Sequence, residues 1–254
     1  LRAGFVMLSD TRTNAGLDNI ATYRKMFVFE DAGERVISIL TAGSLSVTQT
    51  TIARITDAIA HPEASDNNSI MLAPTMLAVA EIVGATLADV STQVADKLQR
   101  MKQSASASMI VAGQRRGGDM RMFLIYPEGN FIEATEDTPF LQIGEHKYGK
   151  PILDRVVKPE TSLEDAQKAA LLSMDSTLRS NLSVGMPLDL MVVKRDTCRV
   201  DLRRRMMRVT PNLPECLRDG ARSCAKGLAK FSYSGSCAFT IALSCNFFQA
   251  VLGG

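Results

Sequence analysis

Short apolar runs bounded by polar turns recur along the chain, and this pattern is typical of β-strands. The runs predict strands at residues 5–8, 25–29, 35–41, 108–112, 121–126, 131–133 and 188–193. Turn-forming sequences at residues 31–34 (DAGE) and 127–130 (PEGN) separate neighbouring runs and predict hairpins. Residues 1–4 also form a turn-like segment, which implies that another strand would pair ahead of the first one.

Three other segments place apolar residues three or four positions apart, as an amphipathic helix does. They span residues 44–60, 71–101 and 162–178. Ser162 with Asp165 three residues later resembles a capping box at the start of the third segment. Paired strands followed by paired helices favour an α+β fold over alternating βαβ units. A core of two sheets between helical layers fits this order.

Composition supports an ordinary globular domain. The 254 residues are 46% hydrophobic and 22% charged, which excludes a disordered or collagen-like chain. With 29 basic and 27 acidic residues, nucleic acid is not an expected partner. The first residues do not form a signal peptide, and the long stretch before the first cysteine favours a cytoplasmic location. Residues 231–254 are uncharged, but Ser244, Asn246 and Gln249 interrupt them, so no membrane association is expected.

The averages conceal a break near residue 194. Residues 194–254 contain eleven Lys and Arg against four Asp and Glu, and they hold all five cysteines. These are Cys198, Cys216, Cys224, Cys237 and Cys245. The cysteines form no CxxC pair, and both histidines lie far upstream. We therefore expect no zinc site, no other metal and no cofactor.

Several catalytic signatures are absent, including G-x-S-x-G, the P-loop lysine motif and H-E-x-x-H. His61 and His146 are expected to be ordinary surface histidines. The first 45 residues are more informative, because Asp10, Lys25 and Gly43 fall at the ends of three predicted strands. If these ends converge, an acid, a lysine and a backbone N–H could activate a hydroxyl and hold an oxyanion. The alternative is a surface ion pair and a glycine needed for backbone geometry.

A resemblance to a known family bears on this choice. Residues 9–50, SDTRTNAGLDNIATYRKMFVFEDAGERVISILTAGSLSVTQT, resemble the start of a proteasome-type subunit, and the similarity is closest to the bacterial Anbu (ancestral beta subunit) group. Residues 142–156 (QIGEHKYGKPILDRV) and 173–192 (SMDSTLRSNLSVGMPLDLMV) extend the similarity to about residues 1–205. The resemblance implies the four-layer αββα sandwich of N-terminal-nucleophile hydrolases. In that family the nucleophile is a threonine at the mature N-terminus, and its own α-amino group is the base.

The resemblance also assigns roles to individual residues. Asp10 matches the acid that orients the site, and Lys25 matches the lysine beside the nucleophile. Gly43 matches the glycine of the oxyanion hole, and Arg12 matches a structural basic residue. Ser183 matches a serine that hydrogen-bonds near the terminal amine.

Two positions depart from the family pattern. Ser180 stands where most proteasome subunits have an aspartate, and Glu145 follows the Ile-Gly pair where they have a serine. The environment of the terminal amine is therefore expected to differ from that of other subunits.

The two ends of the sequence depart as well. The nucleophile belongs on a strand ahead of residues 1–4, which the sequence does not contain. We therefore expect a sheet that lacks one strand, and no activity from the sequence as it stands. After residue 205 the Anbu-like pattern stops, so we divide the chain into a subunit domain, 1–205, and an atypical basic, Cys-containing tail, 206–254. A reading-frame shift near Met206 or a divergent tail would each explain the change.

Three functions remain open from the sequence. The first is a threonine-type hydrolase subunit that cleaves a peptide-like substrate and assembles with copies of itself into a ring or spiral. The sequence does not identify an unfoldase partner for such a subunit. The second is a non-catalytic assembly or scaffold subunit on the same fold. The third, a nucleic-acid or membrane module that uses the basic tail, is disfavoured because such runs are more often solvated tails.

Overall fold

The computed structural model describes residues 3–14, 20–65, 68–98, 106–207 and 239–244. Its strands are β1 (Gly4–Asp10), β2 (Arg12–Asn14), β3 (Ile20–Thr22), β4 (Met26–Asp31), β5 (Arg35–Gly43), β6 (Ala107–Arg115), β7 (Arg121–Ile125), β8 (Phe131–Glu133), β9 (Phe140–Ile143), β10 (Leu188–Lys194), β11 (Leu202–Met206) and β12 (Phe239–Ser244). Its helices are α1 (Leu45–Ala60), α2 (Met76–Leu98), α3 (Lys150–Val156) and α4 (Leu163–Ser180), with a 3-10 turn at Pro62–Ser65.

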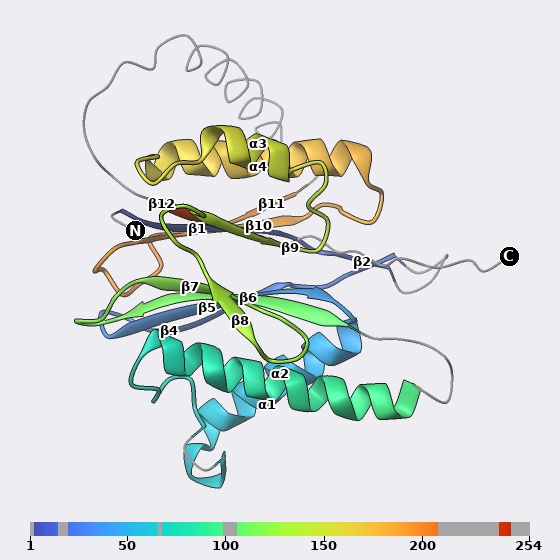
Figure 1. The fold of residues 1–254 in the computed structure, drawn as a ribbon, viewed down its shortest axis with the longest axis vertical. Coiled ribbons are helices and arrows are strands. Elements are labelled where there is room, and N and C mark those ends of the chain that lie inside the picture. Colours follow the sequence, from blue (N-terminus) through green and yellow to red (C-terminus); the bar gives the residue numbers. More distant parts are fainter. Residues whose placement is uncertain (1–2, 15–19, 66–67, 99–105, 208–238, 245–254) are drawn as a thin grey trace, which may run out of the picture.

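Two five-stranded sheets lie face to face between two pairs of helices (Figure 1). The first sheet has the order β11-β10-β1-β12-β9 and is covered by α3 and α4. The second has the order β4-β5-β6-β7-β8 and is covered by α1 and α2. This arrangement confirms the predicted four-layer α+β sandwich.

Strand β1 lies inside the first sheet and is buried along its whole length. Because side chains alternate between the faces of a strand, its residues serve two cores. Val6 and Leu8 pack with α3 and α4, whereas Phe5 and Met7 pack against the second sheet. The continuous apolar run that predicted this strand therefore reflects burial on both faces.

The second sheet divides its residues in the same way. On β5, Ile37 and Ile39 face α1 and α2, and Val36 and Leu40 face the other sheet. Strand β5 pairs antiparallel with both β4 and β6, with Met26 opposite Leu40 and Gly43 opposite Ala107. The start of β4 thus lies beside the end of β5.

Helix α2 begins at Met76, later than the predicted start at residue 71, which is wrong. Pro74 precedes it, and the Thr75 hydroxyl accepts a hydrogen bond from the backbone N–H of Ala78 at 3.1 Å. A proline disfavours helical backbone before it, and Thr75 then caps the first turn. A 20-residue stretch of α2 is long and apolar enough to cross a membrane, but here the helix packs on the second sheet.

The expectation that the first sheet would lack a strand is not met. Strand β12, from the C-terminal tail, lies parallel to β1 on one side and to β9 on the other. Unpaired strand edges are ready partners for another strand, and residues 239–241 (FTI) have high β-propensity. Cys216, Cys224, Cys237 and Cys245 lie outside the described residues, as does most of the uncharged stretch at 231–254. Cys198 is buried, with a free thiol.

Candidate active site

Asp10 is the last residue of β1 and its side chain is fully buried. The end of the strand turns the chain so that backbone groups face this carboxylate. Its Oδ2 accepts hydrogen bonds from the backbone N–H of Arg12 at 3.1 Å and of Gly185 at 3.2 Å. These donors hold the carboxylate in one orientation.

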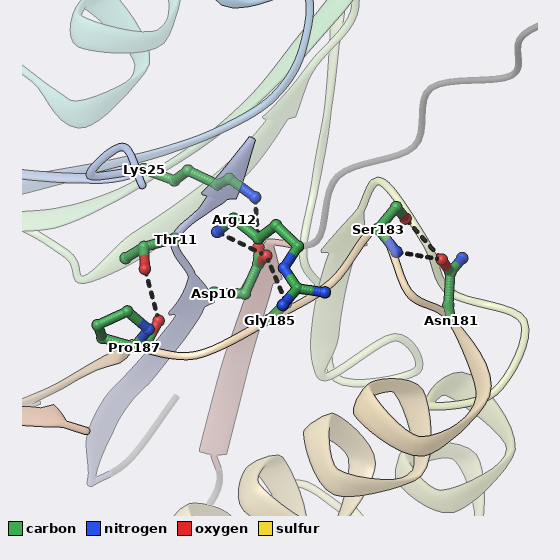
Figure 2. A network of polar contacts seen from close by, with 8 residues as sticks. All are labelled: Asp10, Thr11, Arg12, Lys25, Asn181, Ser183, Gly185 and Pro187. Atoms are coloured by element: carbon green, nitrogen blue, oxygen red, sulfur yellow. Dashed lines mark hydrogen bonds and ion pairs between the residues drawn. The ribbon is translucent and has the colours of Figure 1, made fainter. Parts of the chain in front are cut away.

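Lys25 completes the coordination of this carboxylate. It lies immediately before β4, and its Nζ donates to Asp10 Oδ1 at 2.5 Å (Figure 2). The side chains of Lys25 and Asp10 are only 3% and 0% exposed. The alternative explanation of Asp10 and Lys25 as members of surface ion pairs is therefore wrong, because the fold buries them between the ends of two sheets.

Burial raises the pKa of Asp10 above its ordinary value, because a charged carboxylate loses its hydration. The positive charge of Lys25 and the hydrogen bonds from Lys25, Gly185 and Arg12 oppose that rise. The buried Asp10 carboxyl therefore fixes the position of the Lys25 ammonium group in the site.

Gly43 ends β5 and lies close to Lys25. The antiparallel pairing of β4 and β5 brings them together, and the backbone N–H of Thr41 donates to the Lys25 carbonyl at 3.0 Å. Lys25 and Gly43 line one small pocket together with Thr13, Tyr23, Thr41, Ala42, Leu45 and Thr48. The structure therefore brings together Asp10, Lys25 and the vicinity of Gly43, as the sequence predicted.

Backbone geometry requires a glycine at position 43. Its φ is +102°, and a Cβ there would lie 2.2 Å from the carbonyl oxygen of Ser106. Helix α1 begins two residues later, at Leu45. The chain therefore makes a close turn from β5 into the helix at this point.

The segment that follows α4 closes the site from the other side. The Thr11 hydroxyl donates to the Pro187 carbonyl at 2.8 Å, and the Arg12 guanidinium donates to the Leu182 carbonyl at 2.5 Å. Together with the Gly185–Asp10 hydrogen bond, these contacts attach residues 182–187 to the end of β1 (Figure 2). The Arg12 side chain thus links this segment to the end of β1.

Ser183 lies on this attached segment and belongs to a second polar network. Its backbone N–H and its hydroxyl both donate to Asn181 Oδ1, at 2.8 and 2.6 Å (Figure 2). Asn181 Nδ2 in turn donates to Glu145 Oε2 at 2.7 Å. Glu145 follows β9 and is buried.

Sequence reasoning missed three contributors to the site: Gly185, Asn181 and Thr11. Gly185 is required for steric reasons, because a Cβ there would lie 2.4 Å from Nε of Arg12. A single sequence does not reveal such a contact. His61 and His146 are both exposed, and the His146 ring contacts the Gly144 carbonyl. Within the described ranges, no three His, Cys, Asp or Glu side chains are placed to hold a metal ion.

Comparison with known proteins gives the family. The proteasome subunit family model matches residues 2–193. None of the curated proteins shows significant similarity to the chain.

Solved structures of Anbu proteins resemble the chain over most of its length. Anbu from Yersinia bercovieri is 36% identical, with a TM-score of 0.79 over 92% of this chain and 95% of that chain. The Anbu complex from Pseudomonas aeruginosa, described as a helical assembly, is 40% identical, with a TM-score of 0.78 over 90% and 93%. An Anbu (Gly-1) mutant from Hyphomicrobium sp. strain MC1 is 42% identical, with a TM-score of 0.76 over 89% and 92%. On this evidence the chain belongs to the proteasome subunit family and, within it, to the Anbu (ancestral beta-subunit) group.

Proposed function

We propose that this protein is a subunit of a proteasome-like hydrolase that cleaves peptide or amide bonds with an N-terminal threonine. The threonine would lie on a strand ahead of Leu1 in the native protein. The buried ion pair between Asp10 and Lys25 is the observation that carries the proposal, because such a held charge lowers the cost of forming an alkoxide nearby. A purely structural surface pair would not need this burial.

The chemistry assigns one task to each group. The threonine hydroxyl would pass its proton to the α-amine and attack the substrate carbonyl, with Lys25 stabilising the negative charge on the attacking oxygen. The backbone N–H of Gly43 would stabilise the oxyanion that forms on the carbonyl oxygen. The α-ammonium would then protonate the leaving amine as the C–N bond breaks, and water would release the acyl group from the threonine.

Partners follow from the same proposal. The substrate would be peptide-like, and the subunit would associate with copies of itself in a ring or spiral. The helical assembly described for the Pseudomonas aeruginosa relative supports self-association. We place the protein in the cytoplasm, with reduced thiols, and assign no cofactor, nucleic acid or membrane partner.

A non-catalytic scaffold subunit is the second candidate, and strand β12 favours it. A threonine-bearing strand that entered the sheet from the turn before Gly4 would pair with β1. One edge of β1 is paired with β10 and the other with β12. The catalytic proposal therefore requires that the threonine-bearing strand take the place of β12 beside β1. The scaffold function requires no such exchange of strands.

The intact mass and N-terminal sequence of the protein from its native source separate the two candidates. A mature chain that begins with threonine a few residues before Leu1 supports the hydrolase. A mature chain that begins at Leu1 has no nucleophile and leaves the scaffold as the function.

A further inference from the structure

Two strand edges of the molecule carry opposite charge. In the described part of the chain, β11 pairs only with β10 and β8 pairs only with β7, so each strand has an open edge. Residues 199–205 (RVDLRRR), which include most of β11, contain four arginines and one aspartate, and we call them the basic edge. Residues 127–137 (PEGNFIEATED), which include β8, contain four acidic and no basic residues, and we call them the acidic edge.

The arginines of the basic edge are available to a partner. Arg199, Arg203 and Arg204 are exposed, and none of them forms an ion pair with a described residue. Only Arg205 lies near an acid, with its guanidinium 3.7 Å from the Asp189 carboxylate. Because successive side chains of a strand point to opposite faces, Arg203 and Arg204 place positive charge on both faces of β11.

The acidic edge also has charge to spare. The Glu133 carboxylate is occupied by the Arg121 guanidinium, which donates two hydrogen bonds to it at 2.7 and 2.6 Å. Three other carboxylates are exposed and form no ion pair within the described ranges: Glu128, Glu136 and Asp137. Ile132, in the middle of β8, is 47% exposed. This edge therefore offers negative charge beside an apolar side chain, a combination that suits a protein interface.

The two edges lie on opposite sides of the sandwich. Strand β9 packs against β6 and β7, whereas β12, the next strand of the first sheet, packs against β5. Strands β1, β10 and β11 follow β12 in the same direction, toward β4. The backbone N–H of Val200, two residues before β11, donates to the carboxylate of Glu30 in β4 at 2.9 Å. The basic edge thus lies at the β4 side of the second sheet and the acidic edge at the β8 side.

We propose that the basic edge of one copy of the chain binds the acidic edge of the next copy. The inference rests on the self-association in the proposed function and names the two surfaces that make it. Charges on strand edges also prevent indiscriminate pairing. Opposite signs on the two edges do more, because like edges repel and unlike edges attract, which excludes a two-fold contact through either edge.

A contact between two different surfaces repeats from copy to copy. Such head-to-tail contacts give a ring when the rotation closes and an open helix when it does not. The helical assembly described for the Pseudomonas aeruginosa relative is consistent with a contact of this kind.

Charge reversal tests the contact in the full chain by sedimentation velocity. Arg203→Glu with Arg204→Glu makes the basic edge acidic, and Glu136→Lys with Asp137→Lys makes the acidic edge basic. Each double variant alone should raise the concentration of half-maximal assembly by roughly 100-fold, because like charges then face each other. An equimolar mixture of the two should assemble as the wild type does, since every edge again meets one of opposite sign.

A matched control separates the contact from net charge. Glu63→Lys with Glu160→Lys reverses two exposed acids that lie outside both edges, and it changes the net charge as much as the acidic-edge variant does. Its assembly should match that of the wild type. Circular dichroism of each variant checks that the fold is kept, and assembly in the mixture shows it independently.

The outcomes distinguish this inference from the self-association on which it rests. If the wild type assembles and both edge variants assemble equally well, the two edges are not the contact, and self-association stands. Edge variants that disperse but do not assemble when mixed refute direct pairing of the two edges, as does a control that disperses equally. If the wild type stays monomeric at every concentration, self-association fails and the inference fails with it. The N-terminal sequence of the native protein tests the hydrolase separately.

Discussion

Asp10 and Lys25 are two ionised groups held out of water where the ends of the two sheets meet. Each compensates the charge of the other, so neither can be removed without leaving the partner buried and unpaired. The carboxylate also holds the backbone of Arg12 and Gly185. At the residue scale, therefore, the same pair serves the proposed chemistry and attaches the segment after α4 to β1.

Breaking this pair should destabilise the protein strongly. Lys25→Met is expected to lower the free energy of unfolding at neutral pH by about 3–5 kcal/mol, because the buried Asp10 carboxylate is left without its cation. Asp10→Asn should cost less, because it removes a charge that burial disfavours. The double variant Lys25→Met with Asp10→Asn should recover most of that loss. Urea unfolding of the four proteins gives the coupling, and additive losses would contradict the pairing.

Asp10 should also give the protein a particular pH dependence. Because burial raises the pKa of its carboxyl, the folded state keeps a proton at pH values where the unfolded chain has released it. Its contribution to stability is full below about pH 3.8, the unfolded value, and falls as pH rises to the folded pKa. A carboxyl-carbon NMR titration should give a midpoint for Asp10 above 3.8, and one at or below 3.8 would overturn this direction. The ion pair with Lys25 forms only once the proton has left.

At the scale of elements, the site is assembled from strand ends. Asp10 ends β1, Lys25 precedes β4 and Gly43 ends β5, so the pairing of β4 with β5 sets two of the three positions. The apolar runs of these strands made this convergence predictable from the sequence. The contributions of Asn181 and Gly185 were not predictable, because contacts between segments far apart in the chain decide them.

Elements without a simple pattern also escaped prediction. Strand β11 contains three consecutive arginines at 203–205 on an exposed edge, so it lacks the alternation of a half-buried strand. Strand β9 is only four residues long. Most of the predicted strands lie inside the sheets, where packing imposes an apolar run, whereas β4 and β8 are edge strands that the neighbouring turn sequences made recognisable.

The turn from β5 into α1 should not tolerate a side chain. Gly43→Ala is expected to cost several kcal/mol, because the new Cβ would meet the Ser106 carbonyl and φ is left-handed. Gly33→Ala is a matched control, with φ of +86° but no atom within 4 Å of the new Cβ, and it should cost about 1–2 kcal/mol. Thermal or urea unfolding measures both. Equal losses of unfolding free energy in the two variants would show that the close approach at Gly43 does not affect stability.

Helix α4 begins at a side-chain cap. The Ser162 hydroxyl accepts from the backbone N–H of Asp165 at 3.1 Å and donates to its carboxylate at 2.8 Å, which confirms the predicted cap. Ser162→Ala should lower the free energy of unfolding by about 1 kcal/mol, and Ser162→Thr, which keeps the hydroxyl, should lose less. A larger loss in the threonine variant would argue against the cap as the source of the effect.

At the scale of the whole molecule, β12 joins the two ends of the described chain. Ile241 lies opposite Val6 of β1 and Phe140 of β9. Ile241→Pro removes a backbone donor from the interior of the sheet and should cost about 3 kcal/mol or more in urea unfolding. Ile241→Val keeps the N–H and the β-propensity and serves as the control. An unchanged midpoint in the proline variant would mean that β12 does not stabilise the sheet.

Both edges of β1 are occupied, so hydrogen exchange in the strand beside β1 can show which strand is paired with it. In the chain described here, the amides of residues 239–244 should exchange with deuterated solvent as slowly as those of β1 and β10. A version extended by a strand ahead of Leu1 can accommodate that strand on β1 only by releasing residues 239–244, whose amides would then exchange rapidly. Deuterium uptake of this one segment thus reports whether the native sheet is closed by the front of the chain or by its tail.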